Sequence, residues 1–336
     1  YVLILIILLI KNKYVSYKSN NNIFILMSVL ALYYLISFLD SNMGEYSEYK
    51  IMMFFVKLLP LFLIPFFLKS TANLLNFFKG YIAALIIAFI IIFTNALFFE
   101  SISVNNRFEV GNLNPIWIGR IGMEVLLLLL LLFNKAKYAI YFALPILYVI
   151  FISGTKGALL SFIIVISIYY YNNIQTKKEK VKVFILSTIP LIAIVYLALS
   201  LDPSSYTYQR FFLPVPDNVA ESSYNSSRVV VWPETINKLS QSNILSILFG
   251  NGVGSFGSFY SEQSDYSKRG YPHNIVLELL VEGGVALILI FLIIIFNKNK
   301  YNNNYKYFIL YYFLNANFSG DILNNERIFL YLGAVN

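Results

Sequence analysis

Apolar stretches long enough to cross a lipid bilayer recur along nearly the whole chain. A bilayer core about 30 Å thick needs roughly 20 apolar residues in a helix. Of the 336 residues, 58% are hydrophobic and only 12% are charged, whereas about a quarter of a soluble domain is charged. Because so few charges cannot cover a water-facing surface, the sequence predicts an all-α, polytopic integral membrane protein. We expect residues 1–336 to form a single membrane domain.

About ten or eleven transmembrane helices are expected, several of them short enough to be tilted or re-entrant. The expected spans are residues 1–10, 23–39, 51–68, 81–99, 115–133, 138–153, 158–171, 183–201, 274–296 and 307–314, with a partial span at 328–335.

The connections between the expected spans alternate in charge. Every odd-numbered connection carries lysines, whereas the even-numbered ones hold acids such as Asp40, Glu45 and Glu100. Because lysine-rich loops stay in the cytoplasm, the odd connections are predicted to be cytoplasmic and the even ones to lie outside. The lysines of the odd connections are Lys11, Lys13, Lys18, Lys69, Lys79, Lys135, Lys137, Lys177, Lys178, Lys180, Lys182, Lys298, Lys300 and Lys306.

The connection over residues 202–273 is about 70 residues long and falls on the predicted outer side. Loops of that length are functional or disordered more often than not. Its apolar stretches, Phe211–Val215 and Ile244–Phe249, predict a large structured outer loop on the periplasmic or extracellular side.

Composition excludes several kinds of site. The chain has no cysteine and one histidine, which rules out disulfides and thiolate metal sites and argues against a histidine-ligated metal. The net charge of +8 comes from the cytoplasmic lysines and gives no reason to expect a nucleic-acid partner. Gly252, Gly254 and Gly257 spell GxGxxG, but no strand precedes them, so they predict a tight turn or a backbone approach to a ligand.

The arginines lie outside the predicted cytoplasmic loops. A guanidinium group grips carboxylate or phosphate with two parallel hydrogen bonds, so arginines on the outer face predict an anionic ligand there. The alternative is that they pair with outer-face acids. Arg120 lies inside an expected span, where a charge is costly and by default functional, although Glu124 one turn later offers an ordinary ion pair. The six arginines are Arg107, Arg120, Arg210, Arg228, Arg269 and Arg327.

The sole histidine, His273, lies in the segment GYPHNIVLELLVEGG at the outer mouth of an expected span. Glu278 and Glu282 follow at helical spacing and are expected near the face below it. An imidazole titrates near neutral pH, so His273 is a candidate general base. The alternative is an interfacial polar residue with no catalytic role.

Four segments occur in the order seen in a known superfamily. They are RFEVGNLNPIWIGR at 107–120, SGTKGALLSF at 153–162, SSRVVVWPETINKLSQSNILSILFGNGVGSFGSF at 226–259 and PHNIVLELLVEGGVALI at 272–288. Together they resemble the O-antigen ligase and O-antigen polymerase superfamily of bacterial membrane glycosyltransferases, with Lys156 where arginine is common. SGD at 319–321 is a weaker match. In the ligase pattern, glycine, threonine or tyrosine follows Gly284 by three residues; this chain has Leu287, which favours polymerase.

The resemblance implies a GT-C-like fold in the bacterial inner membrane, with an active site facing the periplasm. The implied reaction is an inverting, metal-independent transfer that needs no cofactor. The donor would be an oligosaccharide on undecaprenyl diphosphate, and a chain-length-regulating co-polymerase is a further candidate partner. The implied catalytic base is His273. Candidate diphosphate or substrate ligands are Arg228, Arg120, Arg210, Arg269, Asn274 and Lys156, and candidate supporting residues are Glu278, Glu282, Asn114 and Trp232.

Two other functions remain open from the sequence. A ligase of the same superfamily would transfer the glycan to lipid A-core, in the biosynthesis of lipopolysaccharide. A polysaccharide transporter or flippase would catalyse no chemistry. Such proteins often show internal repeats and helices broken within the membrane, and the sequence shows no clear internal repeat.

Overall fold

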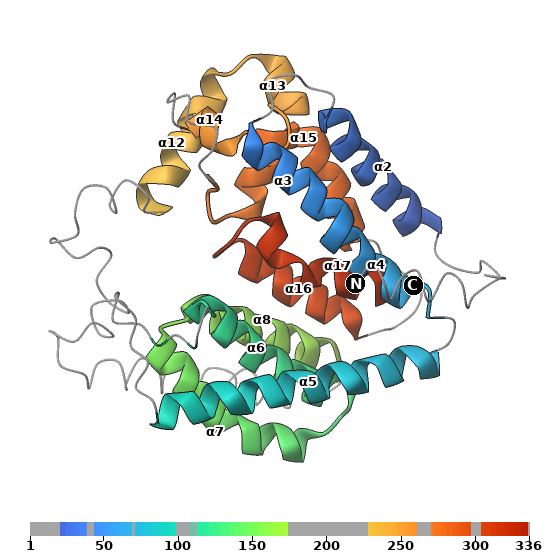
Figure 1. Ribbon diagram of the computed structural model, residues 1–336, viewed down its shortest axis with the longest axis vertical. Coiled ribbons are helices and arrows are strands. Elements are labelled where there is room, and N and C mark those ends of the chain that lie inside the picture. Colours follow the sequence, from blue (N-terminus) through green and yellow to red (C-terminus); the bar gives the residue numbers. More distant parts are fainter. Residues whose placement is uncertain are drawn as a thin grey trace, which may run out of the picture. The chain divides into compact units, whose positions relative to one another are not determined.

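The computed structural model describes residues 21–38, 44–68, 71–98, 108, 110, 113–173, 228–260, 270–296 and 304–334. Regular structure in these ranges is helical, apart from an isolated bridge between Val110 and Leu113. The chain divides into two compact units (Figure 1). The first comprises Tyr1–Leu74 and Glu221–Asn336, and the second Leu75–Ala220.

The first unit is built from helices of both ends of the chain. α3, the π-helix η1 and α4 form one continuous rod, and α15 packs against α2 and α16. α17 packs on α4 so closely that a Cβ atom at Gly333 would lie 2.0 Å from the Phe62 carbonyl oxygen. Its elements are α2 (Asn21–Phe38), α3 (Glu45–Met53), η1 (Phe54–Leu58), α4 (Leu59–Phe66), α12 (Arg228–Gln241), α13 (Ile244–Phe249), α14 (Phe256–Tyr260), α15 (Ile275–Phe296), α16 (Tyr305–Ala316), the 3-10 helix η3 (Ile322–Asn325) and α17 (Arg327–Ala334).

In the second unit, α6 packs against both α7 and α8. Pro115 begins α6 because its missing N–H costs nothing in a first helical turn. Gly154 ends α7 in a left-handed conformation with φ of 65°, which lets α8 start two residues later. The elements are α5 (Thr71–Phe98, of which Leu75 onward belongs to this unit), α6 (Pro115–Leu127), the π-helix η2 (Leu128–Leu132), α7 (Ala136–Ser153) and α8 (Lys156–Asn173).

Five helical rods among the described residues are long and apolar enough to cross a membrane, which confirms the predicted all-α polytopic fold. Helices that are not among these five rods overlap the expected spans at 23–39, 158–171, 307–314 and 328–335. The expected spans at 1–10 and 183–201 lie outside the described residues, and the count of ten or eleven stays a prediction. The five rods are Glu45–Phe66, Ala72–Phe98, Pro115–Leu132, Ala136–Ser153 and Ile275–Phe296.

The rod that begins with α3 starts at Glu45, six residues before the expected boundary at Ile51. The acids Glu45 and Glu48 lie in its first turn, where they complement the positive end of the helix dipole. Because these acids lower the mean hydropathy, the span expected from apolar residues alone leaves out this first turn of the helix. The earlier start brings Tyr46 and Lys50 into the rod, on its buried side.

α15 is broken at Gly284, whose φ of 64° and ψ of −166° are open essentially to glycine alone. The turn that follows α13 fills this break. The Asn251 and Gly252 backbone N–H groups donate to the carbonyl oxygens of Val281 and Glu282, each at 2.9 Å. Gly252 and Gly254 also have positive φ, so the GxGxxG segment makes the predicted tight turn, and its backbone lies against α15.

Gly250 and Gly284 bring the two backbones into direct contact. A Cβ atom at Gly250 would lie 2.3 Å from the Glu282 carbonyl carbon, and one at Gly284 would lie 2.4 Å from the Leu248 carbonyl carbon. Real Cβ atoms do not approach backbone so closely, so both positions require glycine.

We predict that Gly284→Ala destabilises the protein by about 1–3 kcal/mol from backbone strain alone, with the overlap at Leu248 adding to the loss. The matched control is Gly80→Ala within α5, because nothing lies within 4 Å of a Cβ atom there. Thermal unfolding in detergent measures both. Equal melting midpoints for the two variants would contradict the described contact.

Candidate functional site

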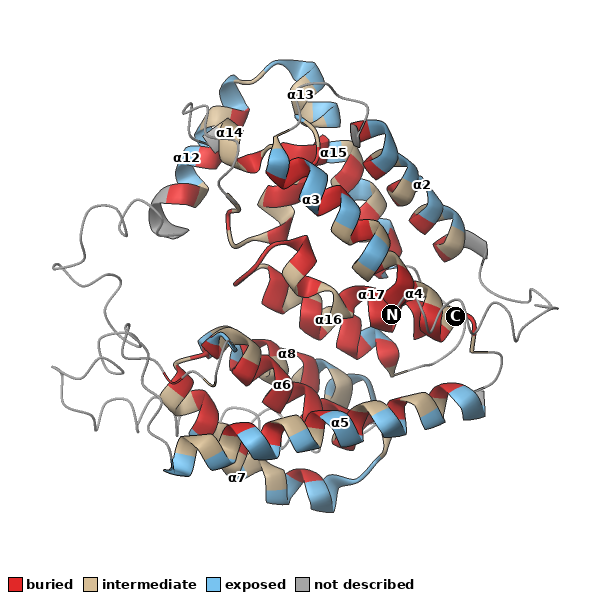
Figure 2. Cartoon of the chain, viewed as in Figure 1, coloured by how far each residue is buried: buried red, intermediate tan, exposed pale blue. Residues whose placement is uncertain are grey.

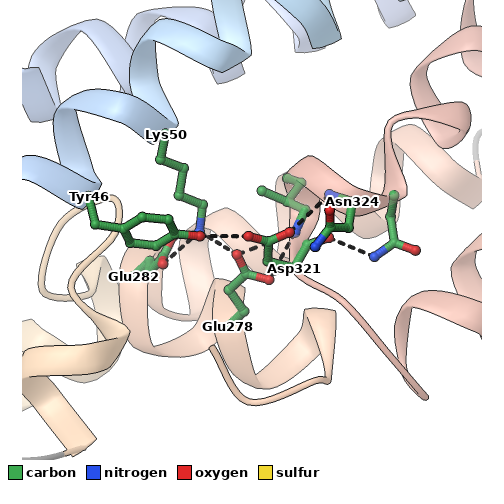
Figure 3. Close-up of polar contacts among 8 residues, drawn as sticks. Tyr46, Lys50, Glu278, Glu282, Asp321 and Asn324 are labelled. Carbon is green, nitrogen blue, oxygen red and sulfur yellow. Dashed lines mark hydrogen bonds and ion pairs between the residues drawn. The ribbon is translucent and has the colours of Figure 1, made fainter. Parts of the chain in front are cut away.

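A buried lysine joins α3 to α15 (Figure 3). Lys50 donates to a carboxylate oxygen of Glu278 and to both carboxylate oxygens of Glu282, the latter at 2.7 and 2.6 Å. Glu278 and Glu282 lie one turn apart on the same face of α15, so one ammonium group reaches both. At most 1% of any of the three residues is exposed.

Asp321 extends this cluster to the connection between α16 and α17. The Tyr46 hydroxyl donates to Asp321 Oδ2 at 2.6 Å, and the Asn324 N–H donates to Oδ1 at 2.9 Å. The Ile322 N–H donates to Glu278 Oε2 at 3.0 Å. Three chain segments far apart in sequence thus meet at one set of hydrogen bonds, which we call the Lys50 cluster: Tyr46, Lys50, Glu278, Glu282 and Asp321.

The Lys50 cluster sets one lysine against three carboxylates within the described part of the chain. Removing an ion from water costs several kcal/mol, and hydrogen bonds must offset that cost. Each carboxylate here accepts at least two hydrogen bonds. The cluster therefore depends on all of its donors, Lys50 above all.

The glycine turn lies against the cluster as well. The Tyr33 hydroxyl of α2 donates to the Glu282 carbonyl oxygen at 2.5 Å, beside the bond from Gly252. A Cβ atom at Gly254 would lie 2.7 Å from the Ser47 Cα atom of α3. Lys50 thus holds α15 at the level of its break, where α2, α3 and the glycine turn converge.

His273 lies two residues before the first residue of α15 and has a positive φ of 55°. Both of its neighbours in the chain are fixed. The Trp232 indole N–H donates to the Pro272 carbonyl oxygen at 2.8 Å, and Asn274 Oδ1 caps α15 by accepting from the N–H groups of Val276 and Leu277. The Tyr271 ring packs edge-on to the imidazole, with centroids 4.5 Å apart.

α12, α14 and α15 enclose a small apolar core formed by Val231, Leu239, Phe256 and Val281. Trp232 packs against this core while it bonds to Pro272. Residues 228–260 and 270–273 of the predicted outer loop are therefore structured, as expected, and they support the His273 segment. The rest of that loop lies outside the described residues.

The second unit brings together two of the segments that carry the resemblance. Arg120 is 1% exposed on α6, and its guanidinium carbon lies 5.7 Å from the Trp117 ring centroid. Thr155, next to Lys156, approaches α6 so closely that a Cβ atom at Gly119 would lie 2.1 Å from its hydroxyl oxygen. Lys156 therefore begins α8 beside the turn of α6 that carries Arg120.

Two further predicted residues of the second unit have structural partners. Asn114 caps α6, since its side-chain oxygen accepts from the Ile116 N–H at 3.0 Å. Glu124, the candidate ion-pair partner of Arg120, accepts a hydrogen bond from the Tyr81 hydroxyl at 3.0 Å.

The remaining arginines divide into three groups. Arg327 donates to the Tyr312 hydroxyl at 3.0 Å and so links α17 to α16. Arg228 is the first residue of α12, one turn before Trp232, and its side chain lies outside what the structure describes. Arg107, Arg210 and Arg269 lie wholly outside the described residues.

Sequence reasoning missed Tyr46, Lys50 and the role of Asp321. One signal was present: two glutamates one turn apart inside an expected span require a cation on a neighbouring helix. Lys50, directly before an expected span, was a candidate for that cation. Among the described residues, no group of three or more histidine, cysteine or acidic side chains is arranged to hold a metal ion.

The fold and its buried charged groups define an α-helical, multi-pass membrane protein. Residues 140–292, from within α7 to within α15, match the family model described as O-antigen ligase. The match confirms the resemblance to the O-antigen ligase and polymerase superfamily and supports a glycosyltransferase-type activity in general. No curated protein and no solved structure matches the chain.

We predict that Lys50→Met destabilises the protein by about 3–5 kcal/mol, because it leaves two buried carboxylates without their cation. The matched control is Lys57→Met, seven residues along the same rod. Lys57 is 33% exposed and lies 3.5 Å from Glu326, so its loss should cost at most about 1 kcal/mol. Thermal midpoints in detergent test the difference, and comparable losses for the two variants would refute the buried pairing.

Proposed function

We propose that this protein is an oligosaccharide repeat-unit polymerase of the bacterial inner membrane. It joins repeat units carried on undecaprenyl diphosphate, on the outer face of the membrane, with inversion at the anomeric carbon and without a metal ion. The observation that carries the proposal is the fixed position of His273 at the start of α15, within the matched residues.

The surroundings of His273 suit a general base. Catalytic groups work best when neighbouring contacts fix them in place, and here Trp232 holds Pro272 while Asn274 is committed to the helix cap. The imidazole is half-buried, and histidine is the side chain best suited to accept and release a proton at physiological pH.

In the proposed step, His273 takes the proton of an acceptor sugar hydroxyl as that oxygen attacks the anomeric carbon of the donor glycan. A new C–O bond forms while the bond from the anomeric carbon to the diphosphate breaks. Undecaprenyl diphosphate leaves with the electron pair, and the imidazolium later returns its proton to solvent.

Arginine would stabilise the charge that develops on the departing diphosphate, since a guanidinium stays protonated and hydrogen-bonds phosphate in pairs. Arg228 is the first candidate, because α12 carries it one turn before the tryptophan that holds the His273 segment. Arg120, Arg210, Arg269 and Lys156 are further candidates from the sequence.

The preference for polymerase over ligase rests on Leu287. Leu287 is buried and fills the space beside Gly283, where a Cβ atom on that glycine would lie 2.3 Å from the leucine Cβ. The departure from the ligase pattern therefore falls at the break in α15. The ligase alternative, with lipid A-core as acceptor, uses the same His273 chemistry.

A transporter is the second candidate function, and one observation favours it. α15 is broken at Gly284 beside buried charged residues, and broken helices form the substrate sites of many transporters. The family match and the fixed histidine favour a transferase instead.

We predict that His273→Asn strongly slows glycan transfer while the protein still folds. Asparagine tolerates positive φ better than alanine, so it removes the base and keeps the backbone. Purified protein in liposomes, supplied with a lipid-linked repeat unit and no ion gradient, should produce lengthened lipid-linked chains. The variant should be slower by about 10²–10⁴-fold, the usual contribution of general base catalysis.

The outcomes separate the candidate functions. Transfer to added lipid A-core without lengthening on the carrier would mean ligase. Movement of glycan across the bilayer with neither product would mean transporter. A folded His273→Asn variant with the wild-type rate would show that His273 is not the base.

A further inference from the structure

α13 presents an exposed apolar surface within the predicted outer loop (Figure 2). Four of its six residues, Ile244, Leu245, Leu248 and Phe249, are between 40 and 65% exposed. Single exposed apolar side chains are ordinary, but a contiguous group indicates contact with a membrane or a partner. Exposure of these four apolar side chains to water would be energetically unfavourable.

The depth of α13 follows from its contact with α15. Gly284 contacts Leu248, and it is the tenth residue of the 22-residue helix. At about 1.5 Å per residue, it lies roughly 14 Å along the helix from Ile275. The 12 residues after the break would span only about 18 Å, so α15 needs its first half as well to cross a bilayer. α13 therefore contacts α15 at a level inside the membrane.

The backbone of this segment is suited to a lipid environment, where each polar group needs a partner within the protein. The Ser246 N–H donates to the Asn243 side chain and the Gly250 N–H donates to the Ser246 carbonyl oxygen. Beyond α13, Asn251 and Gly252 donate to the carbonyl oxygens that the break in α15 exposes. Residues 244–250 also contain no charged side chain.

The apolar surface continues from α13 onto a membrane-spanning helix. Val285 directly follows the contact glycine and is partly exposed, and Leu289 and Ile293 are more than half exposed further along α15. These positions follow helical spacing on the lipid-facing side of a span. The exposed face of α13 adjoins these α15 side chains at Gly284. Lipid acyl chains that contact α15 therefore also reach α13.

We propose that residues 244–250 form a re-entrant segment embedded in the outer half of the bilayer, with Ile244, Leu245, Leu248 and Phe249 in contact with lipid acyl chains. The Asn243 cap marks its polar edge, and the glycine turn returns the chain along α15. The partner of this surface is the membrane itself. The proposal does not depend on the reaction that the protein catalyses.

The absence of cysteine from the sequence makes a direct test possible. Single-cysteine variants Leu245→Cys and Phe249→Cys receive a nitroxide spin label in the full chain and are reconstituted in phosphatidylcholine vesicles. Leu289→Cys on α15 is the lipid-facing reference, and Ser240→Cys, exposed near the end of α12, is the polar reference. Power-saturation EPR then measures collisions with oxygen, which concentrates in lipid, and with a water-soluble nickel chelate.

We expect the ratio of oxygen to nickel accessibility at 245 and 249 to match that at 289 and to exceed that at 240 severalfold. High nickel accessibility at 245 and 249 would overturn the proposal, because it would place α13 in water. Low accessibility to both reagents would also overturn it, because protein and not lipid would then cover the surface. Two labelled positions, each with a wild-type elution profile in detergent, guard against a local disturbance by one label.

Discussion

The ion pair of Lys50 with Glu278 and Glu282 is the interaction on which the first unit depends. A charge buried in a membrane protein is costly unless an opposite charge lies beside it. Here the Lys50 ammonium group pairs with two carboxylates that lie one turn apart on α15. Tyr46 and Asp321 then connect that pair to the region between α16 and α17. Since breaking a buried pair leaves an uncompensated charge, the cluster fixes how α3, α15 and the C-terminal helices meet.

This constraint reaches the candidate catalytic residue through α15. Glu282 lies two residues before the break at Gly284, and its carbonyl oxygen accepts hydrogen bonds from Tyr33 and Gly252. The glycine turn connects α13 to α14, which shares an apolar core with α12 and Trp232. Trp232 holds Pro272, and His273 lies two residues before the first residue of α15, the helix that Lys50 holds further on through Glu278 and Glu282. The His273 segment is thus supported at both of its ends by contacts that the fold makes regardless of substrate.

The helices could be predicted from the sequence because the length of an apolar run is a local property. The expected span at 115–133 ends one residue after η2, which continues α6, and the span at 138–153 begins two residues after the start of α7. Lys50 could not be assigned in this way, because its partners lie 228 and 232 residues away and pairing depends on tertiary packing. The break at Gly284 could not be predicted either, because an apolar run that contains two glycines is still predicted to be one helix.

For Asn274 and Asn114, the sequence suggested ligand binding or support. The structure adds a helix-capping role, which a local pattern of asparagine before a helix can indicate.

The most direct test of this account is a double-mutant cycle between Lys50 and Glu282, with thermal stability in detergent as the readout. If the two groups form a buried pair, Glu282→Gln should offset part of the damage done by Lys50→Met, because it removes a carboxylate that has lost its cation. The double variant should then melt above the Lys50→Met single variant. Losses that simply add would contradict the account, because they would mean that Lys50 and Glu282 do not interact.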